Sequence, residues 1–248
     1  MVAPLFFTDN ISSLKVGAEF VLGGAEGKHA AVVRRMRAGE AIQLTDGHGF
    51  RVVGTVSRVD AATVVIAISE TLLEELPKLQ LTLVQALAKG DRDELAVQAA
   101  TELGVLKVIP WQATRSISRW EGPKAAKGQA RWQTIATEAS KQSLRAWEPE
   151  VQAIVSTKEL TKVVKDFDHV LVLDPTASHS ITALGGISGR VAVVVGPEGG
   201  IYPHELSELE SAGAKRVHLG AGILRTSTAG LAAIAYLVGS SGLWDSAE

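Results

Sequence analysis

Hydrophobic and polar positions alternate through much of the first third of the chain, which predicts strands there rather than helices. Residues 40–45, 50–59 and 63–68 show this two-residue period, and residues 46–49 (Asp-Gly-His-Gly) form a turn signal between the first two. Short strands joined by tight turns are typical of a small β-barrel. Ahead of these strands, residues 28–37 carry three arginines and predict a short helix.

From residue 79 onward, apolar runs alternate with stretches of helical period. The predicted strands are residues 79–87, 105–111, 151–155, 169–173, 191–195 and 216–219. The predicted helices are residues 91–103, 124–147, 158–167, 203–212 and 226–239. This alternation predicts a parallel sheet with helices on both faces. Residues 70–78 are acidic and contain Pro77, which indicates a linker between a β-barrel domain over residues 1–75 and an α/β domain over residues 78–248.

Composition excludes several classes of protein. With 46% hydrophobic residues and a net charge of −2, the 248-residue chain is too apolar and too weakly charged for a disordered protein. It has no cysteine, so disulfides, thiolate metal sites and a cysteine nucleophile are excluded. The six histidines are scattered without metal-ligand spacing, and we predict no metal. No apolar run approaches the roughly 18 residues of a membrane span, and no secretory signal is evident, so we expect a cytoplasmic location.

The distribution of charge changes the meaning of the low net charge. A chain of net charge −2 lacks the basic excess that is usual for a nucleic-acid binder. However, residues 107–145 carry eight basic residues against two acidic ones, and residues 28–51 carry five against two. The RNA-binding residues that we predict in these zones are Arg34, Arg35, Arg37, Arg115, Arg119 and Arg145. Trp111, Trp120, Trp132 and Trp147 lie within or just after residues 107–145; we expect most of them in the core, but an accessible ring would stack on an unpaired base.

Two glycine-rich loops follow predicted strands near the C-terminus. Residues 196–200 read Gly-Pro-Glu-Gly-Gly, and residues 219–230 read Leu-Gly-Ala-Gly-Ile-Leu-Arg-Thr-Ser-Thr-Ala-Gly and lead into a helix with hydroxyl residues at its start. Open α/β sheets bind ligands beyond the carboxyl ends of their strands, which is where these loops lie. Either loop alone is also compatible with an ordinary tight turn. Neither matches a P-loop, a G-x-G-x-x-G dinucleotide site or a G-x-S-x-G nucleophile elbow.

Taken together, the two loops resemble the C-terminal signature of the SPOUT methyltransferases, and more narrowly of the RsmE branch, the bacterial 16S ribosomal RNA uridine-N3 methyltransferases. Residues 89–93 (Lys-Gly-Asp-Arg-Asp) and 101–105 (Thr-Glu-Leu-Gly-Val) also resemble that branch, as do Pro110 with Arg115, the residues between Glu138 and Pro149, and the barrel segment from His29 to the Asp46-Gly47 turn. The resemblance therefore covers nearly the whole chain.

The resemblance implies a PUA-like, RNA-binding β-barrel followed by an α/β domain whose C-terminal part forms a trefoil knot. It also implies S-adenosyl-L-methionine as methyl donor, a homodimer, and 16S ribosomal RNA of the small ribosomal subunit as substrate. The cofactor-binding residues that it implies are Leu173, Gly196, Pro197, Glu198, Gly199, Gly200, Leu219, Gly220, Ile223, Leu224, Thr228 and Ala229.

Methylation at uridine N3 requires loss of a proton, and a cation near O2 or O4 would stabilise the resulting anion. We expect Arg225 to be this catalytic cation; the alternative is a structural arginine. Ser227 stands where the family pattern commonly has Glu, and we interpret it as a tolerated helix-cap variant. The general base stays unassigned, with Glu138 as a weaker candidate.

Two other functions remain open from the sequence. One is a SPOUT methyltransferase that acts on another RNA position, either a ribose 2′-oxygen or a tRNA base. The other is a non-catalytic RNA-binding factor for ribosome assembly. The sequence does not determine the order of binding, or whether naked RNA or an assembled subunit is the substrate.

Overall fold

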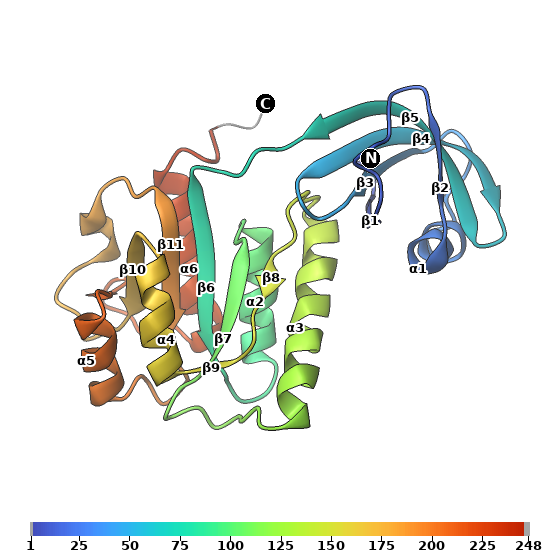
Figure 1. Ribbon diagram of the computed structural model, residues 1–248. Helices are drawn as coiled ribbons and strands as arrows, with labels where there is room; N and C mark the ends of the chain where they lie inside the picture. The colour runs from blue at the N-terminus through green and yellow to red at the C-terminus, as the bar shows by residue number, and fades with distance from the viewer. Residues whose placement is uncertain (1, 246–248) are drawn as a thin grey trace. The chain divides into compact units, whose positions relative to one another are not determined.

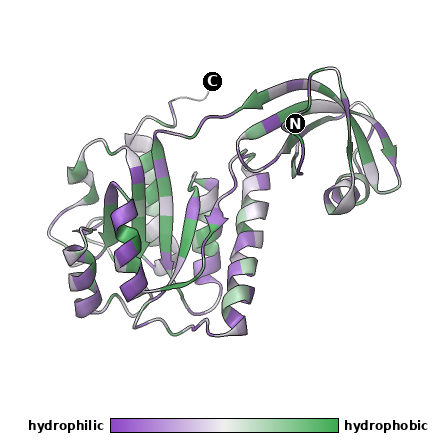
Figure 2. Ribbon diagram, viewed as in Figure 1, coloured by the Kyte–Doolittle hydropathy of each residue, from purple (hydrophilic) through white to green (hydrophobic). Residues whose placement is uncertain are grey.

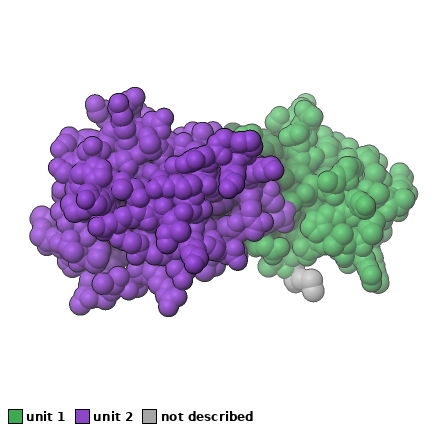
Figure 3. All heavy atoms as spheres, turned by 90° about the horizontal axis from the view of Figure 1, so that it is seen from below, with its two compact units in different colours: residues 1–76, 140–148 green, residues 77–139, 149–248 purple. Residues whose placement is uncertain are grey.

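The computed structural model describes residues 2–245, which form two compact units (Figure 3). The first unit contains the residues up to Leu76 together with the segment Ser140–Glu148. The second contains Pro77–Ala139 and the residues from Pro149 onward. The segment Ser140–Glu148 is remote in sequence from the rest of the first unit, and a single boundary drawn along the chain does not anticipate it.

Five strands form the sheet of the first unit, in the order β1-β3-β4-β5-β2 (Figure 1). They are β1 (Leu5–Phe7), β2 (Glu19–Leu22), β3 (Ala41–Thr45), β4 (Phe50–Asp60) and β5 (Thr63–Leu73). β1 runs parallel to β3, and all other neighbours are antiparallel. The three predicted strands are confirmed, whereas β1 and β2 were not predicted. β2 lies at the edge of the sheet and fully buries only Leu22, so its sequence lacks the alternation of a half-buried strand.

The predicted turn between β3 and β4 is confirmed. The Asp46 carboxylate accepts hydrogen bonds from the backbone N–H groups of His48 (2.8 Å) and Phe50 (3.2 Å). Gly49 has a φ of +94°, and a Cβ there would lie 2.6 Å from the Trp147 ring. Glycine is therefore required at position 49 both by the backbone conformation and by the close approach of an aromatic side chain.

The helix predicted over residues 28–37 is wrong in its position. The helical turns are α1 (Gly24–Lys28) and a π-helix (His29–Val33), so they begin earlier and end before the arginines. Arg34 N–H closes the last wide turn on the His29 carbonyl (2.9 Å), and Arg35 has a φ of 55° that ends the helix. The arginines consequently lie on an exposed turn rather than on a helix face.

The segment Ser140–Glu148 is tied to the first unit by polar contacts. Thr45 Oγ1 donates to the Ala146 carbonyl (3.1 Å), and Arg51 donates to the Leu144 carbonyl (2.7 Å). Helix α3 (Pro123–Gln142) ends at the start of this segment, and Leu144 has a φ of 55°. The prediction of a helix as far as residue 147 is therefore wrong at its C-terminal end, because the chain leaves the helix to pack against β3 and β4.

The second unit is built on a parallel sheet in the order β12-β10-β11-β6-β7-β8, with β9 also paired to β7. Its strands are β6 (Leu79–Ala86), β7 (Lys107–Gln112), β8 (Glu150–Val151), β9 (Val155–Ser156), β10 (His169–Leu173), β11 (Gly189–Val195) and β12 (Lys215–Val217). Its helices are α2 (Arg92–Glu102), α3, α4 (Thr157–Val163), α5 (Pro203–Ser211) and α6 (Thr226–Ser240), with 3-10 turns at Val164–Asp166 and Ile181–Leu184. The predicted parallel α/β sheet is confirmed; the strand predicted over residues 151–155 is split into β8 and β9.

Helices cover both faces of this sheet. Successive residues of β11 point to opposite faces, so Val193 joins the core formed with α2, α3 and α6, while Val194 joins the core formed with α4 and α5. Figure 2 shows the central strands as mostly hydrophobic and the outer sides of the helices as hydrophilic. Burial on both faces explains why these strands are continuous apolar runs.

Candidate active site

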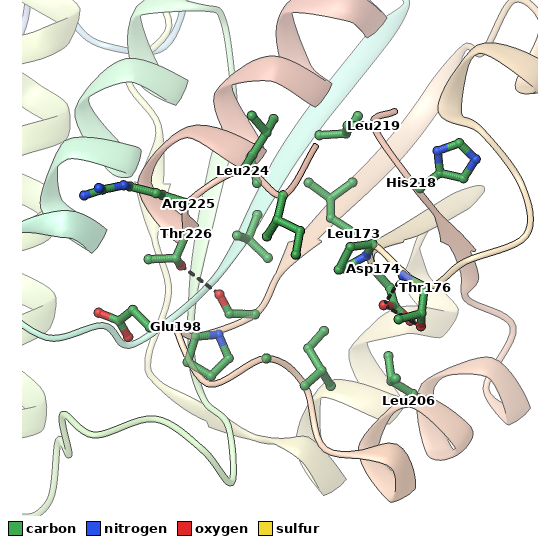
Figure 4. Close-up of a pocket in the computed structure, with 18 of the residues that line it drawn as sticks. Leu173, Asp174, Thr176, Glu198, Leu206, His218, Leu219, Leu224, Arg225 and Thr226 are labelled. Carbon is green, nitrogen blue, oxygen red and sulfur yellow. Dashed lines mark hydrogen bonds between the residues drawn. The ribbon is translucent and has the colours of Figure 1, made fainter. Parts of the chain in front are cut away.

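A pocket of about 680 Å³ lies at the carboxyl ends of three adjacent strands, β12, β10 and β11 (Figure 4). It is within the range of about 300–1,000 Å³ that is typical of small-molecule sites. Of the predicted cofactor residues, those that line it are Leu173, Gly196, Pro197, Glu198, Gly200, Leu219, Ile223, Leu224 and Ala229. Gly199, Gly220 and Thr228 belong to the same loops or to the first turn of α6, but they are not among the lining residues.

The first loop, Gly196 to Gly200, is a tight turn that is held in place by a side chain from another segment. Gly200 N–H donates to the Pro197 carbonyl (2.9 Å), and Gly200 has a φ of +72°, a region that favours glycine. The Arg115 guanidinium donates to the Gly199 carbonyl (2.9 Å) and lies over the Tyr202 ring, 5.0 Å from its centre. The loop is thus fixed to the segment that follows β7.

The second loop leads from β12 to α6. Gly220 has a φ of +109°, and its N–H donates to His218 Nδ1 (3.1 Å). The side chains that follow are exposed apolar groups: Ile223 is 81% exposed and Leu224 is 43% exposed. Both side chains line the pocket and leave apolar surface beside it.

Thr226 joins the two loops to the centre of the sheet. Its Oγ1 donates to the Gly196 carbonyl (2.7 Å) and accepts a hydrogen bond from Gln85 Nε2 (3.0 Å) at the end of β6. Arg225, not a hydroxyl residue, is the N-cap of α6 and makes no side-chain capping bond. The interpretation of Ser227 as a helix cap is therefore wrong: Ser227 is a buried residue of the first helical turn.

Leu173 and Asp174 form the wall at the end of β10. Asp174 is buried, and its carboxylate accepts from the backbone N–H of Thr176 (2.9 Å) and from Arg216 Nε (2.7 Å). Burial raises the pKa of Asp174, but the hydrogen bonds from Thr176 and Arg216 outweigh it, so the pKa lies below its ordinary value. This carboxylate is therefore ionised at neutral pH.

Glu198 links the first loop to the segment after β6. Its Oε1 accepts from Lys89 N–H (2.9 Å) and from the Arg92 guanidinium (3.1 Å). Burial by itself raises the pKa of Glu198. The backbone N–H donors and Arg92 lower it by more, so the pKa lies below its ordinary value. Arg92 also lines the pocket, so the Lys89–Asp93 motif contributes a residue that the sequence did not single out.

Glu205 is a fully buried carboxylate below the first loop. It accepts from Thr114 N–H (2.9 Å), Thr157 Oγ1 (2.6 Å) and Tyr202 N–H (3.2 Å). These donors come from three segments, the one after β7, the start of α4 and the start of α5. Burial raises the pKa of Glu205, but the three donors outweigh it and lower the pKa. The sequence offered no signal for this role beyond the position of Glu205 in the first turn of a helix.

Arg225 is exposed at the edge of the pocket. In Figure 4 its side chain extends away from Leu173 and Leu219, on the side of the pocket where Glu198 lies. Its guanidinium makes no ion pair with any residue of the described chain, 2–245. The guanidinium is therefore open to a group outside the described chain.

The predicted RNA-binding arginines fall into three environments. Arg34, Arg35 and Arg37 are exposed on the first unit, and Arg115 and Arg119 are exposed on the second. Arg145 is different, because it is half-buried in the first unit and burial lowers its pKa to about 10 despite the nearby Glu74. Among the tryptophans, Trp111 and Trp132 are core residues, whereas Trp120 and Trp147 are partly exposed.

The described residues hold neither a cluster of metal ligands nor a membrane-spanning helix. Within residues 2–245, no three histidine, cysteine or acidic side chains gather as metal ligands would. None of the helices described is long and apolar enough to cross a membrane.

Most of the chain matches known protein families. Residues 74–238 match an RNA methyltransferase domain, and residues 14–68 match an RNA methyltransferase PUA domain. The ribosomal RNA small subunit methyltransferase E of Mycobacterium bovis is 38% identical over 250 residues, covering 99% of this chain and 95% of the relative. The protein of the same name from Bacillus subtilis is 34% identical, covering 87% and 88%.

Solved structures agree with these relatives. The ribosomal RNA small subunit methyltransferase E of Neisseria gonorrhoeae, bound to S-adenosyl methionine, superposes with a TM-score of 0.85 at 31% identity and covers 96% of this chain and 98% of its own. The fold and pocket, together with the PUA domain, thus define an RNA methyltransferase. More narrowly, the chain belongs to the ribosomal RNA small subunit methyltransferase E family, which confirms the RsmE resemblance.

Proposed function

We propose that this protein transfers the methyl group of S-adenosylmethionine to N3 of a specific uridine in 16S ribosomal RNA of the small subunit. The observation that carries this proposal is the joining of two glycine-rich loops and Leu173 into one pocket at the carboxyl edge of the sheet. The relative from Neisseria gonorrhoeae, similar over nearly its whole length, was crystallised with this cofactor.

The lining of the pocket suits S-adenosylmethionine. Leu173, Leu219 and Leu224 provide apolar walls for an adenine ring, and the loop backbones provide donors and acceptors for its edge. Ionised Asp174 and Glu198 provide acceptors for the hydroxyl and ammonium donors of the cofactor. When bound, the cofactor supplies a methyl group on a cationic sulfonium. We infer that these residues hold it, together with the remaining predicted loop residues.

Arg225 acts on the acceptor side in this proposal. A guanidinium beside O2 or O4 of the uracil stabilises the negative charge that develops when N3 loses its proton. Glu138, the weaker candidate for the base, is exposed on α3 and does not line the pocket. Ser227 is buried in α6. The base stays unassigned, and transfer then depends mostly on alignment of N3 with the methyl group.

Assembly, topology and location form part of the same proposal. Leu95 on α2 is 52% exposed, and with Ile223 and Leu224 it leaves apolar surface on the second unit that a homodimer would cover. The trefoil knot and the cytoplasmic location likewise remain predictions from the family and from the sequence. So does the absence of a resident metal.

The proposal is tested first by thermal unfolding with S-adenosylmethionine. At 100 times its Kd, the cofactor is expected to stabilise the protein by about 2.7 kcal/mol, whereas ATP, as a control nucleotide, is expected to have no effect. No stabilisation by saturating cofactor would favour the non-catalytic assembly factor.

Mass mapping of 16S RNA from a strain without the gene then locates the product: 3-methyluridine should be missing and be restored by the purified protein. If 3-methyluridine persisted and a ribose or tRNA methyl group were lost instead, the result would favour a methyltransferase that acts on that other RNA position.

The role of the first unit is tested by charge reversal. Arg34→Glu with Arg35→Glu is expected to weaken binding of 16S RNA at least tenfold and to reduce the slope of log affinity against log salt by about one to two, with unchanged affinity for the cofactor. Lys158→Glu with Lys165→Glu, exposed residues of the second unit, is the charge-matched control. Equal RNA affinity of the two double variants would show that Arg34 and Arg35 do not contribute to RNA binding.

A further inference from the structure

A second hollow, of about 270 Å³, lies at the same edge of the parallel sheet. Two segments form it, one from Ala88 to Glu94 after β6 and one from Ile117 to Trp120 after β7, with Trp132 of α3 behind them. β6 and β7 are the next two strands beyond β11 in the sheet order. The first pocket therefore occupies the ends of β12, β10 and β11, and the second occupies the ends of their neighbours.

The two hollows share a boundary made of defined contacts. The Glu198 side chain lines the first pocket, and its carboxylate binds the backbone N–H of Lys89, which lines the second. Arg92 belongs to the segment of the second hollow, yet it lines the first and is paired with the same carboxylate. A molecule in the second hollow would therefore lie directly beside the loop that holds the methyl donor.

One wall of the second hollow is a rigid aromatic ring. Trp120 packs edge-to-face against Trp132, with ring centres 4.9 Å apart and planes at 70°. Its backbone N–H donates to Gln112 Oε1 (2.9 Å), and a Cβ at Gly128 would lie 2.4 Å from the ring. Trp120 is nevertheless only partly buried, and the adjacent Ile117 is 68% exposed. A fixed, reachable ring of this kind is a stacking surface for an unpaired base.

The remaining wall is the loop after β6, whose conformation is fixed by hydrogen bonds and which carries a cation. Asp93 is buried, and its carboxylate accepts the N–H groups of Ala88 (3.0 Å) and Glu94 (2.9 Å), which fixes the turn. Glu94 is neutralised by a bidentate ion pair with Arg131. The exposed Lys89 ammonium makes no ion pair with a residue of the described part of the chain. The wall therefore offers one available positive charge to an anionic ligand.

We propose that this second hollow receives the unstacked uridine of the substrate RNA, with its ring against Trp120 and its phosphate beside Lys89. A base that undergoes chemistry must leave its stack, and an aromatic wall next to a cation is what such a nucleotide requires. Glu198, whose carboxylate binds the Lys89 N–H of this hollow, lies on the same side of the donor pocket as Arg225 (Figure 4). This inference rests on the proposed function and adds to it the place where the acceptor binds.

Steady-state kinetics with small subunits from a strain without the gene test the two walls. Lys89→Ala and Trp120→Leu are each expected to raise the KM for the subunit about tenfold or more, while the Kd of S-adenosylmethionine changes less than twofold. Trp120→Phe keeps an aromatic ring and is expected to restore most of the loss. Lys158→Ala, on the helix that covers the opposite face of the sheet, is the matched control. An unchanged KM in Lys89→Ala, or in Trp120→Leu with an unchanged Tm, would overturn the inference; should Trp120→Leu not fold, Lys89→Ala decides alone.

Photo-crosslinking of the unmodified protein gives an answer that does not depend on the stability of any variant. A 16S transcript with part of its uridine replaced by 4-thiouridine is crosslinked alone and after reconstitution into subunits. The expected crosslinked peptides contain residues 88–94 or 117–120. Absence of crosslinks within residues 88–94 and 117–120, from a protein that still methylates the RNA, would refute the acceptor site but leave the proposed function intact. Absence of methylation with normal cofactor binding would instead reject the proposed function.

Discussion

Replacement of Arg225 by alanine is expected to lower kcat by about two to three orders of magnitude, the usual cost of removing one group that stabilises a developing anion. Arg225 lies at the rim of the pocket as the N-cap residue of α6, and it makes no capping bond or ion pair within residues 2–245. Its removal should therefore leave the fold intact. The Kd of S-adenosylmethionine is expected to stay within a few-fold of its original value.

The pH dependence of kcat distinguishes a catalytic Arg225 from a structural one. A nearby guanidinium favours the deprotonated uracil and so lowers the pKa of N3 in the complex. In Arg225→Ala that pKa rises, and the rising limb of the profile is expected to move to higher pH. Arg225→Lys, which keeps a cation, should lie between the two. Arg190→Ala, an exposed arginine at the opposite end of β11, is the control. An unchanged kcat in Arg225→Ala would remove Arg225 from catalysis, and a large fall in Tm would show that its role is structural.

Glu205→Ala is expected to destabilise the protein by about 3 kcal/mol, because it leaves three hydrogen-bond donors without their buried acceptor. In a chain of this size the Tm should fall by roughly 6–12 °C. The loss of the bond to Tyr202 N–H also frees the end of the first cofactor loop, so the Kd of S-adenosylmethionine is expected to rise about tenfold. Glu208→Ala, an exposed residue of the same helix, is the control.

The contribution of Glu205 to stability also depends on pH. Its pKa is below the ordinary value in the folded protein, so the stabilisation is fully present above the unfolded-state pKa. It is lost as the pH falls through that value towards the lower folded-state pKa. Acid unfolding should therefore be less steep in Glu205→Gln than in the original protein. Identical Tm values for the alanine variants at positions 205 and 208 would show that the buried network does not support the loop.

Much of this molecule can be predicted from local pattern. The strands β6, β10 and β11 are buried on both faces, so their apolar runs are unambiguous. The first glycine-rich loop follows β11 and the second follows β12. Prediction failed where distant contacts decide the backbone. α3 stops at Gln142 because the next residues pack on the first unit, and the arginine turn follows a π-helix whose last hydrogen bond reaches back to His29.

The sequence by itself determined the class of fold, the two loops, and the family, because these depend on short-range periodicity and on motifs that are contiguous in the chain. Only the tertiary structure decided which residues serve the site from elsewhere. Glu205 collects donors from three segments, and Thr226 bonds both Gln85 and Gly196. Trp120, one of five tryptophans in the sequence, lines a hollow beside the donor pocket together with Trp132. Such roles arise from the parallel sheet, which brings the carboxyl ends of strands that are remote in sequence to one edge.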